Sequence, residues 1–340
     1  MSRFSTAAFS RRRFLAASAG ATATLLAAAA CGDSDDDTAD SASSSSGSSA
    51  SSGFPVTIEH KFGSTTVEKA PERVVSLGWA DADVLLALGV VPVGFLDWFK
   101  VWDAGVGPWA QDKLGSSKPT VMTGEVNFEK VASLRPDLIT FVQSDGAKAT
   151  WEKLKQLAPS IYGPAAAPAW GVTWKDQTEY IAKSVGKLAD GQKLIDATGA
   201  AFAKAKAANP EFAGKTVAVA AAYDGKYGAY VGQDARVQFM QALGFTNSPK
   251  LEALKKESFY IDLSKERVGL LDADVTIVFG LASTTPLAQD TVLQSIPSAK
   301  AGRLVIIDDA DLANAFSTNS VLSIPWTIEK FVPQIKKALA

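Results

Sequence analysis

Histidine and cysteine are almost absent from this chain, which has only His60 and Cys31. Triads built on histidine and multi-histidine zinc sites are therefore excluded, and we expect His60 to be an exposed strand residue. A single cysteine excludes an intrachain disulfide, a zinc ribbon and a Cys-x-x-Cys redox motif. The chain also lacks the Gly-x-Ser-x-Gly, phosphate-loop and His-Glu-x-x-His motifs. We therefore expect a binding protein that is not an enzyme and has no cofactor or metal of its own.

An excess of charge of either sign is missing as well. The 34 basic and 36 acidic residues leave a net charge of −2, and no basic stripe indicates nucleic-acid binding. The composition, 47% hydrophobic and 21% charged, is that of a globular protein. A length of 340 residues allows one large domain or two of medium size.

The N-terminus has the pattern of an export signal. Arg11 and Arg12 precede Phe14 and an alanine-rich apolar run that is too short for a comfortable membrane span. The paired arginines resemble a twin-arginine signal, which we assign to residues 1–30. Small residues before Cys31 resemble a lipobox, although Ala28 stands where leucine is usual. We predict that Cys31 is lipidated; the alternative is an ordinary signal peptide in which Cys31 has no role.

Residues 31–53 follow this signal and consist of Cys31 and a segment rich in serine and aspartate. Such a composition buries too little apolar surface to fold, so we predict a disordered tether. The remainder of the chain is then expected outside the cytoplasm, held by the lipid at the outer face of the cytoplasmic membrane.

From residue 54 onward, short apolar runs alternate with helical patterns. This alternation predicts an α/β lobe over residues 54–171 and a second over 211–340. Between them, residues 172–210 show helical spacing without a strand pattern, which predicts one long bridging helix that Gly186, Gly191 and Gly199 could bend. The expected fold is two Rossmann-like lobes with a ligand cleft between them.

Three motifs occur in order along the first lobe: Pro71–Leu77 (PERVVSL), Leu85–Gly94 (LLALGVVPVG) and Leu134–Ile139 (LRPDLI). Together they resemble the periplasmic-binding-protein family of ABC importers for ferric siderophores and cobalamin. The resemblance covers about residues 55–340 and implies a monomeric lipoprotein that delivers a ferric siderophore to a membrane permease. Cobalamin or haem as cargo, and a surface sensor without a transport role, are the alternatives.

In that family one glutamate on each lobe docks into arginine pockets of the permease. By motif position, these glutamates correspond to Glu129 in Asn-Phe-Glu-Lys-Val and Glu266 in Ser-Lys-Glu-Arg-Val. Two exposed carboxylates on equivalent helices would suit a twofold partner. Alternatively, both are solvated acids that the helix dipole favours near a helix start.

Aromatic residues are concentrated in the segments that follow predicted strands, where two-lobed α/β proteins bind ligands. Rigid rings in such loops suit a bulky, partly apolar ligand, whose oxygens tyrosine or arginine can bind. The predicted ligand-binding residues are Trp79, Trp98, Trp102, Trp109, Trp170, Trp174, Tyr223, Tyr227, Tyr230, Arg236 and Phe316. Trp151 lies within a helical pattern, so we expect it to belong to the core.

Overall fold

The computed structural model describes residues 53–223, 226–256, 258–280 and 286–340. The predicted signal, Cys31 and all but the last residue of the tether lie outside these residues. The described chain begins with an antiparallel hairpin of β1 (Val56–His60) and β2 (Gly63–Val67).

The N-terminal lobe is built on a parallel five-stranded sheet in the order β5-β4-β3-β6-β7. Its strands are β3 (Val74–Ser76), β4 (Gly94–Asp97), β5 (Thr120–Thr123), β6 (Leu138–Phe141) and β7 (Ser160–Tyr162). Its helices are α1 (Asp81–Ala87), α2 (Phe128–Ser133) and α3 (Lys148–Leu154). The strand order reverses between β3 and β6, and ligands of open α/β sheets bind at the carboxyl ends of strands flanking such a reversal.

The C-terminal lobe is built on a mixed sheet in the order β11-β9-β8-β12-β13, with β10 paired to β8. Four strands run parallel to one another: β8, β10, β12 and β13. β9 is antiparallel to both of its neighbours, β8 and β11. The strands are β8 (Thr216–Tyr223), β9 (Lys226–Tyr230), β10 (Thr246–Asn247), β11 (Tyr260–Leu263), β12 (Val275–Gly280) and β13 (Leu304–Ile307). The helices are α6 (Ala235–Ala242), α7 (Pro249–Glu252), α8 (Pro297–Lys300), α9 (Ala310–Thr318) and α10 (Ser323–Leu339). The predicted two-lobed α/β architecture is thus confirmed.

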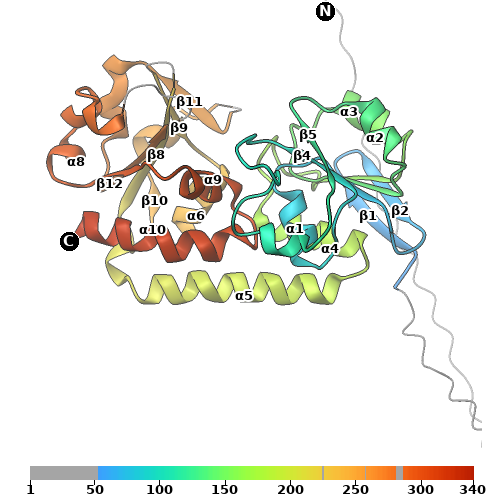
Figure 1. Ribbon diagram of the computed structural model, residues 1–340. Coiled ribbons are helices and arrows are strands. Elements are labelled where there is room, and N and C mark those ends of the chain that lie inside the picture. Colours follow the sequence, from blue (N-terminus) through green and yellow to red (C-terminus); the bar gives the residue numbers. More distant parts are fainter. Residues whose placement is uncertain (1–52, 224–225, 257, 281–285) are drawn as a thin grey trace, which may run out of the picture. The chain divides into compact units, whose positions relative to one another are not determined.

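The segment between the sheets differs from the predicted single helix. It forms α4 (Trp174–Ser184) and α5 (Leu188–Ala207), and α5 lies against both α4 and α10 (Figure 1). Gly186 ends α4 because its φ of 70° is left-handed. The amide of Lys187 then bonds the carbonyl of Ala182, and that of Gly186 the carbonyl of Lys183, in a Schellman cap.

The largest apolar core runs through both lobes and connects them. It includes Ile58 of the hairpin, Leu85 of α1, Ile181 of α4, Phe202 of α5 and Phe331 of α10, each at most 5% exposed. Side chains on the outer faces of the two sheets form separate clusters. Because one core spans α1, α4, α5 and α10, the two lobes are packed as one unit.

Candidate functional site

A cavity of about 140 Å³ lies at the carboxyl ends of β3 and β6, where the strand order reverses. Both lobes contribute to its wall. The lining residues are Trp79, Gln143 and Trp170 from the N-terminal lobe, and Asp234, Ala235, Arg236, Phe259 and Ser317 from the C-terminal lobe. The predicted cleft residues Trp79, Trp170 and Arg236 are therefore brought together here.

Asp81 holds the N-terminal wall of this cavity in place. Its carboxylate accepts hydrogen bonds from the amide of Val142 at 2.8 Å and from Nε2 of Gln177 at 2.7 Å. The same Nε2 donates to the carbonyl of Trp79 at 2.7 Å. Complete burial raises the pKa of Asp81 to about 6, although these hydrogen bonds act in the opposite direction. The carboxylate thus links the loop after β3 to the end of β6.

Trp170 is positioned by Gln143. Nε2 of Gln143 donates to the carbonyls of Trp170 and Val172, and its Oε1 accepts from the amide of Val172 at 3.1 Å. The amide of Trp170 donates to the carbonyl of Ser144 at 2.9 Å. Trp170 has a left-handed φ of 59°, which is uncommon for a bulky side chain. These bonds hold the ring at the cavity wall in spite of that backbone conformation.

Arg236 is the charged group on the opposite wall. Its Nη1 forms an ion pair with Asp234 at 2.8 Å, and its Nε donates to Oγ of Ser317 at 3.1 Å. The guanidinium lies 4.0 Å from the ring centre of Tyr230, within cation–π range. Nη2 has no protein acceptor among the described residues. Arg236 is thus rigidly held while one nitrogen remains available to a ligand.

A second cavity of about 300 Å³ adjoins the first, and Phe259 lines both. Neighbouring residues of the chain line different cavities. Trp170 lines the first cavity, whereas Ala169 and Gly171 line the second, and Gln233 of the second cavity directly precedes Asp234 of the first. The lining residues are Pro168, Ala169, Gly171, Val231, Gln233, Lys255, Lys256, Ser258 and Phe259. Together the two cavities form the candidate binding cleft.

A continuous row of aromatic rings leads away from the cleft, and we call it the aromatic row. Neighbouring ring centres are 4.7 to 6.1 Å apart. In order, its members are Trp170, Trp98, Trp79, Phe99, Trp102, Trp109 and Trp326. Such tilted and edge-to-face pairs stabilise one another and fix the geometry of the loops that carry them.

Two indoles of this row join the lobes by hydrogen bonds, and a third forms a hydrogen bond within the N-terminal lobe. Nε1 of Trp79 donates to the carbonyl of Ser317 at 3.2 Å, and Nε1 of Trp102 donates to Asp311 at 2.8 Å. Nε1 of Trp109 donates to Asp83 at 2.7 Å.

Asp83 also accepts from Oγ of Ser320 in the other lobe at 2.6 Å. Burial raises the pKa of Asp83 to about 6. Trp98, Trp102 and Trp109 line a separate cavity of about 40 Å³, apart from the cleft.

Four of the predicted ligand residues are buried in the protein interior, and the structure corrects their assignment. Trp174 is 8% exposed and packs on Phe202, and Tyr227 is 1% exposed and donates to Asp290. Phe316 has no exposed surface. Its ring packs in the core between Phe239 and Phe331. Tyr230 is 6% exposed beneath the Arg236 guanidinium, so it supports that residue and does not face the cleft.

Tyr223 lies at the end of β8, and its hydroxyl donates to Asp262 of β11. Tyr223 is not among the described residues that line the two cavities of the cleft. The lining residues that the sequence did not single out include Gln143, Lys255, Lys256, Phe259 and Ser317. Lys255, Lys256 and Phe259 lie far from the end of any predicted strand. Gln143 directly follows the end of β6, but its side chain has neither a ring nor a charge, so it was not predicted from the sequence.

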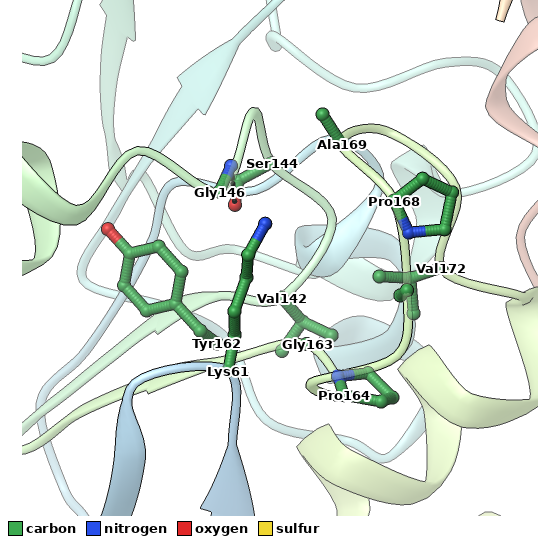
Figure 2. Close-up of a pocket in the computed structure, with 11 residues that line it drawn as sticks. Lys61, Val142, Ser144, Gly146, Tyr162, Gly163, Pro164, Pro168, Ala169 and Val172 are labelled. Atoms are coloured by element: carbon green, nitrogen blue, oxygen red, sulfur yellow. Dashed lines mark hydrogen bonds between the residues drawn. The ribbon is translucent and has the colours of Figure 1, made fainter. Parts of the chain in front are cut away.

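Lys61 lines a smaller pocket on the N-terminal lobe, where it extends toward Ser144 and Gly146 (Figure 2). Its free volume is about 10 Å³, which is about the space of one water molecule and too small for a chelate. Next to it, His60 is 5% exposed and in contact with Trp151, so the prediction of an exposed histidine is wrong. Trp151 packs on Phe62 at the edge of the core, as expected.

The two predicted docking residues are exposed. Glu129 lies in the first turn of α2, and Glu266 lies in a short 3-10 helix, Lys265–Leu271. A hydrogen bond from the side chain of Ser264 lowers the pKa of Glu266. Each helix leads into a strand of its own sheet, β6 or β12, so the two positions are equivalent in the two lobes.

Within the described part of the chain, no three histidine, cysteine or acidic side chains are grouped closely enough to bind a metal ion. No helix in that part has both the length and the apolar character needed to cross a membrane.

Comparison with known proteins places these observations in context. Residues 74–310 match the periplasmic binding protein family. The probable siderophore-binding lipoprotein YfiY of Bacillus subtilis is 31% identical over 238 residues, covering 67% of this chain and 70% of the relative. The Fe(3+)-citrate-binding protein YfmC of the same organism is 26% identical over 224 residues, covering 65% of this chain and 67% of the relative.

A solved structure gives a similar result. The iron-uptake ABC transporter substrate-binding protein PiaA of Streptococcus pneumoniae superposes with a TM-score of 0.70 and 30% identity, covering 84% of this chain and 99% of PiaA. Its complex with ferrichrome superposes with a TM-score of 0.71 and 29% identity, covering 84% of this chain and 98% of PiaA.

Proposed function

Because this chain belongs to the periplasmic binding protein family, we propose that it is the extracytoplasmic substrate-binding component of an ABC importer for a ferric siderophore. The relatives and similar structures named above are binding proteins for siderophores or ferric citrate. The role is one of binding and delivery, without a catalytic step.

The observation that carries the proposal is the composition of the cleft. Trp79, Trp170 and Phe259 offer ring surfaces to the apolar parts of a chelate, and Arg236 offers a nitrogen to its oxygens. A ferric siderophore brings its iron already coordinated. The protein therefore needs to recognise only the organic shell, which these side chains can do.

The N-terminal sequence supports a further proposal on location. Arg11, Arg12 and Phe14 would direct export, and Cys31 would carry a lipid at the outer face of the cytoplasmic membrane. Residues 32–53 would then connect that anchor to the folded lobes. In this position the exposed carboxylates of Glu129 and Glu266 would meet the permease.

The test is a titration of intrinsic tryptophan fluorescence with ferric hydroxamate, ferric carboxylate and ferric catecholate chelates, and with haem and cobalamin. We expect saturable quenching by at least one ferric chelate, because Trp79 and Trp170 line the cleft. Binding of haem or cobalamin alone would contradict the proposal. Deletion of the gene should abolish uptake of the same iron-loaded chelate, and unchanged uptake would instead indicate a sensor.

A further inference from the structure

The cavity of about 40 Å³ that lies apart from the cleft is placed between the loop after β4 and the start of α1. Thr318, at the end of α9, is its only lining residue from the C-terminal lobe among those described. One water molecule needs about 10–15 Å³ of such space. The cavity can therefore hold a small ion or the end of a chain, but not a chelate.

Aromatic rings form much of the wall of this cavity. The indole N–H groups among them already donate to other groups, namely the carbonyl of Leu77 and the carboxylates of Asp311 and Asp83. A wall of rings attracts a cation through the ring quadrupoles, and aromatic cages of this kind recognise ammonium ligands. The five aromatic lining residues are Phe95, Trp98, Phe99, Trp102 and Trp109.

Two buried aspartates, Asp83 and Asp97, line the same cavity and are 5% and 4% exposed. Oδ2 of Asp83 accepts from Trp109 at 2.7 Å and from Ser320 at 2.6 Å. Oδ1 of Asp97 accepts from two backbone amides of the following loop, both at 2.9 Å. The second oxygen of each carboxylate accepts no hydrogen bond from a described residue. Each aspartate thus has one oxygen left for a donor inside the cavity.

No cation of the described chain balances these two carboxylates. No described basic residue lines the cavity, and none forms an ion pair with either aspartate. The remaining residues of the two lobes, at 224–225, 257 and 281–285, include no basic side chain, and the four arginines before residue 53 belong to the predicted signal. Buried charges are normally paired, and burial raises the pKa of Asp83 to about 6. The cavity therefore lacks a counter-charge that a bound cation can supply.

From the rings and the two carboxylates together, we propose that this cavity binds a primary ammonium group, either the ammonium ion or the protonated amine of a short alkyl chain. Its N–H groups donate to the free oxygens of Asp83 and Asp97, and its charge lies against the rings. Such a group has at least three donors and no acceptor, which matches this wall. A metal cation suits the cavity less well, because hard cations take about six or more oxygen ligands. The site is separate from the cleft and does not depend on the cargo.

The experiment measures urea unfolding without any chelate, in about 0.1 M of one chloride salt at a time. The salts are those of ammonium, methylammonium, sodium, potassium and tetramethylammonium, the last having the same charge but no N–H group. The test variant is Asp97→Asn, which removes the charge and keeps Oδ1 as the acceptor for the two loop amides. The control is Asp112→Asn, at an exposed position on the neighbouring 3-10 helix Gln111–Leu114 that does not line the cavity.

We expect ammonium or methylammonium to raise the folding equilibrium constant of the wild type about tenfold over the other salts, as a Kd of about 10 mM would do. The control should show the same gain, and Asp97→Asn should lose it. In tetramethylammonium chloride, Asp97→Asn should be at least as stable as wild type, because an unpaired buried charge has been removed. An aspartate that only holds the loop would not produce this reversal.

The arms also distinguish the two sources of the ammonium group. A gain with ammonium alone supports the free ion, and an equal or larger gain with methylammonium supports the amine of a chain. Equal stability of the wild type in all five salts would overturn the site, as would an undiminished gain in Asp97→Asn. An equal gain with sodium or potassium would overturn the assignment to ammonium. None of these results bears on siderophore binding, which the chelate titration tests.

Discussion

At the scale of single residues, hydrogen-bonding partners and burial determine which rings a ligand can reach. Trp79 and Trp170 are half-buried and line the cleft, whereas Trp174 is packed on Phe202. All three were predicted as ligand residues because they follow strands or flank the bridging segment. Their sequence positions are similar, but only the fold determines on which side of the backbone each ring lies.

Replacing Trp79 with alanine should therefore weaken ligand binding and have a smaller effect on stability. Burial of one ring contributes on the order of 1–3 kcal/mol, so we expect about a ten- to hundredfold rise in Kd. Trp174→Ala should instead lower the free energy of unfolding by about 3–5 kcal/mol and leave the affinity of the folded protein unchanged. Quenching titrations and urea unfolding measure the two effects. An exchange of the two phenotypes would refute the assignment of the cleft.

The protonation state of His60 is set by its neighbours. Oγ1 of Thr65 donates to the carbonyl of Ser160, so Nε2 of His60 must donate to Thr65. The amide of Phe62 donates to Nδ1. Protonation of the ring would place a second proton on Nδ1, directly against that N–H group, which disfavours the charged form. Burial also lowers the pKa of His60 below 6.5.

The stability that His60 contributes should therefore depend on pH. It is fully present above pH 6.5, the unfolded-state value, and is lost as the pH falls below it, by at most about 1.4 kcal/mol per pH unit. The pKa values of Asp81 and Asp83 are raised to about 6, so the stability that these two residues contribute is lost as the pH rises through 6. The wild type must therefore be compared with His60→Gln, which isolates the contribution of the histidine. In urea unfolding between about pH 8 and 5, the difference between the two proteins should shrink at low pH. A constant difference would show that His60 does not titrate in this way.

At the scale of elements, the apolar runs at residues 73–77, 93–96, 138–142, 216–222, 274–279 and 304–307 correctly predicted the strands β3, β4, β6, β8, β12 and β13. The strands that were missed lie toward the edges of the sheets or are short. β5 and β7 are the two edge strands of the N-terminal sheet, and β9 contains Gly228. Their pairing depends on partners far away in sequence, as in the register of Tyr260 with Tyr230, and no local pattern indicates such a contact.

The break between α4 and α5 gives a matched pair of glycine variants. Gly186→Ala should destabilise the protein by about 1–2 kcal/mol or more, because φ is left-handed and the new β-carbon would lie 2.5 Å from the ring of Phe54. Gly199 lies inside α5 with no atom within 4 Å of an added β-carbon. Gly199→Ala should therefore stabilise by about 0.5–1 kcal/mol. Thermal unfolding of both variants is the measurement, and equal effects would argue against the left-handed cap.

At the scale of the whole molecule, the two-lobed fold and the general place of the cleft followed from the sequence, whereas much of its wall did not. Trp79, Trp170 and Arg236 were found because rings and charges near strand ends are conspicuous. Phe259, Lys255 and Lys256 lie between α7 and β11, and reach the cleft only through the tertiary fold. Phe316 illustrates the opposite error, since it follows the last strand and yet belongs to the core.

Binding and delivery should be separable by substitution at the proposed docking residues. Glu129→Lys and Glu266→Lys place a cation where the permease is expected to present arginines, and such repulsion can cost several kcal/mol. Cellular uptake of the iron-loaded chelate should fall by about tenfold or more. The chelate affinity of the purified variants should match that of wild type. Normal uptake by both variants would refute the docking assignment.

Membrane attachment is tested separately at the N-terminus. Cys31→Ser should move the protein from the membrane fraction to the soluble fraction, or leave an uncleaved precursor. Replacing both Arg11 and Arg12 with lysine should block export. Cell fractionation and immunoblotting report both, and membrane association of a processed Cys31→Ser protein would exclude a lipid on that residue.

The aromatic row also determines how the tryptophan fluorescence of the protein changes when a ligand binds. Six of the eight tryptophans belong to it, and neighbouring ring centres are at most 6.1 Å apart. Excitation absorbed anywhere along such a row can migrate from ring to ring until it reaches Trp79 or Trp170 at the cleft. A bound ferric chelate that accepts this energy would then quench the fluorescence of every tryptophan in the row. The amplitude of quenching would exceed the share of the two tryptophans that touch the ligand, and the remaining emission would come mainly from Trp151 and Trp174.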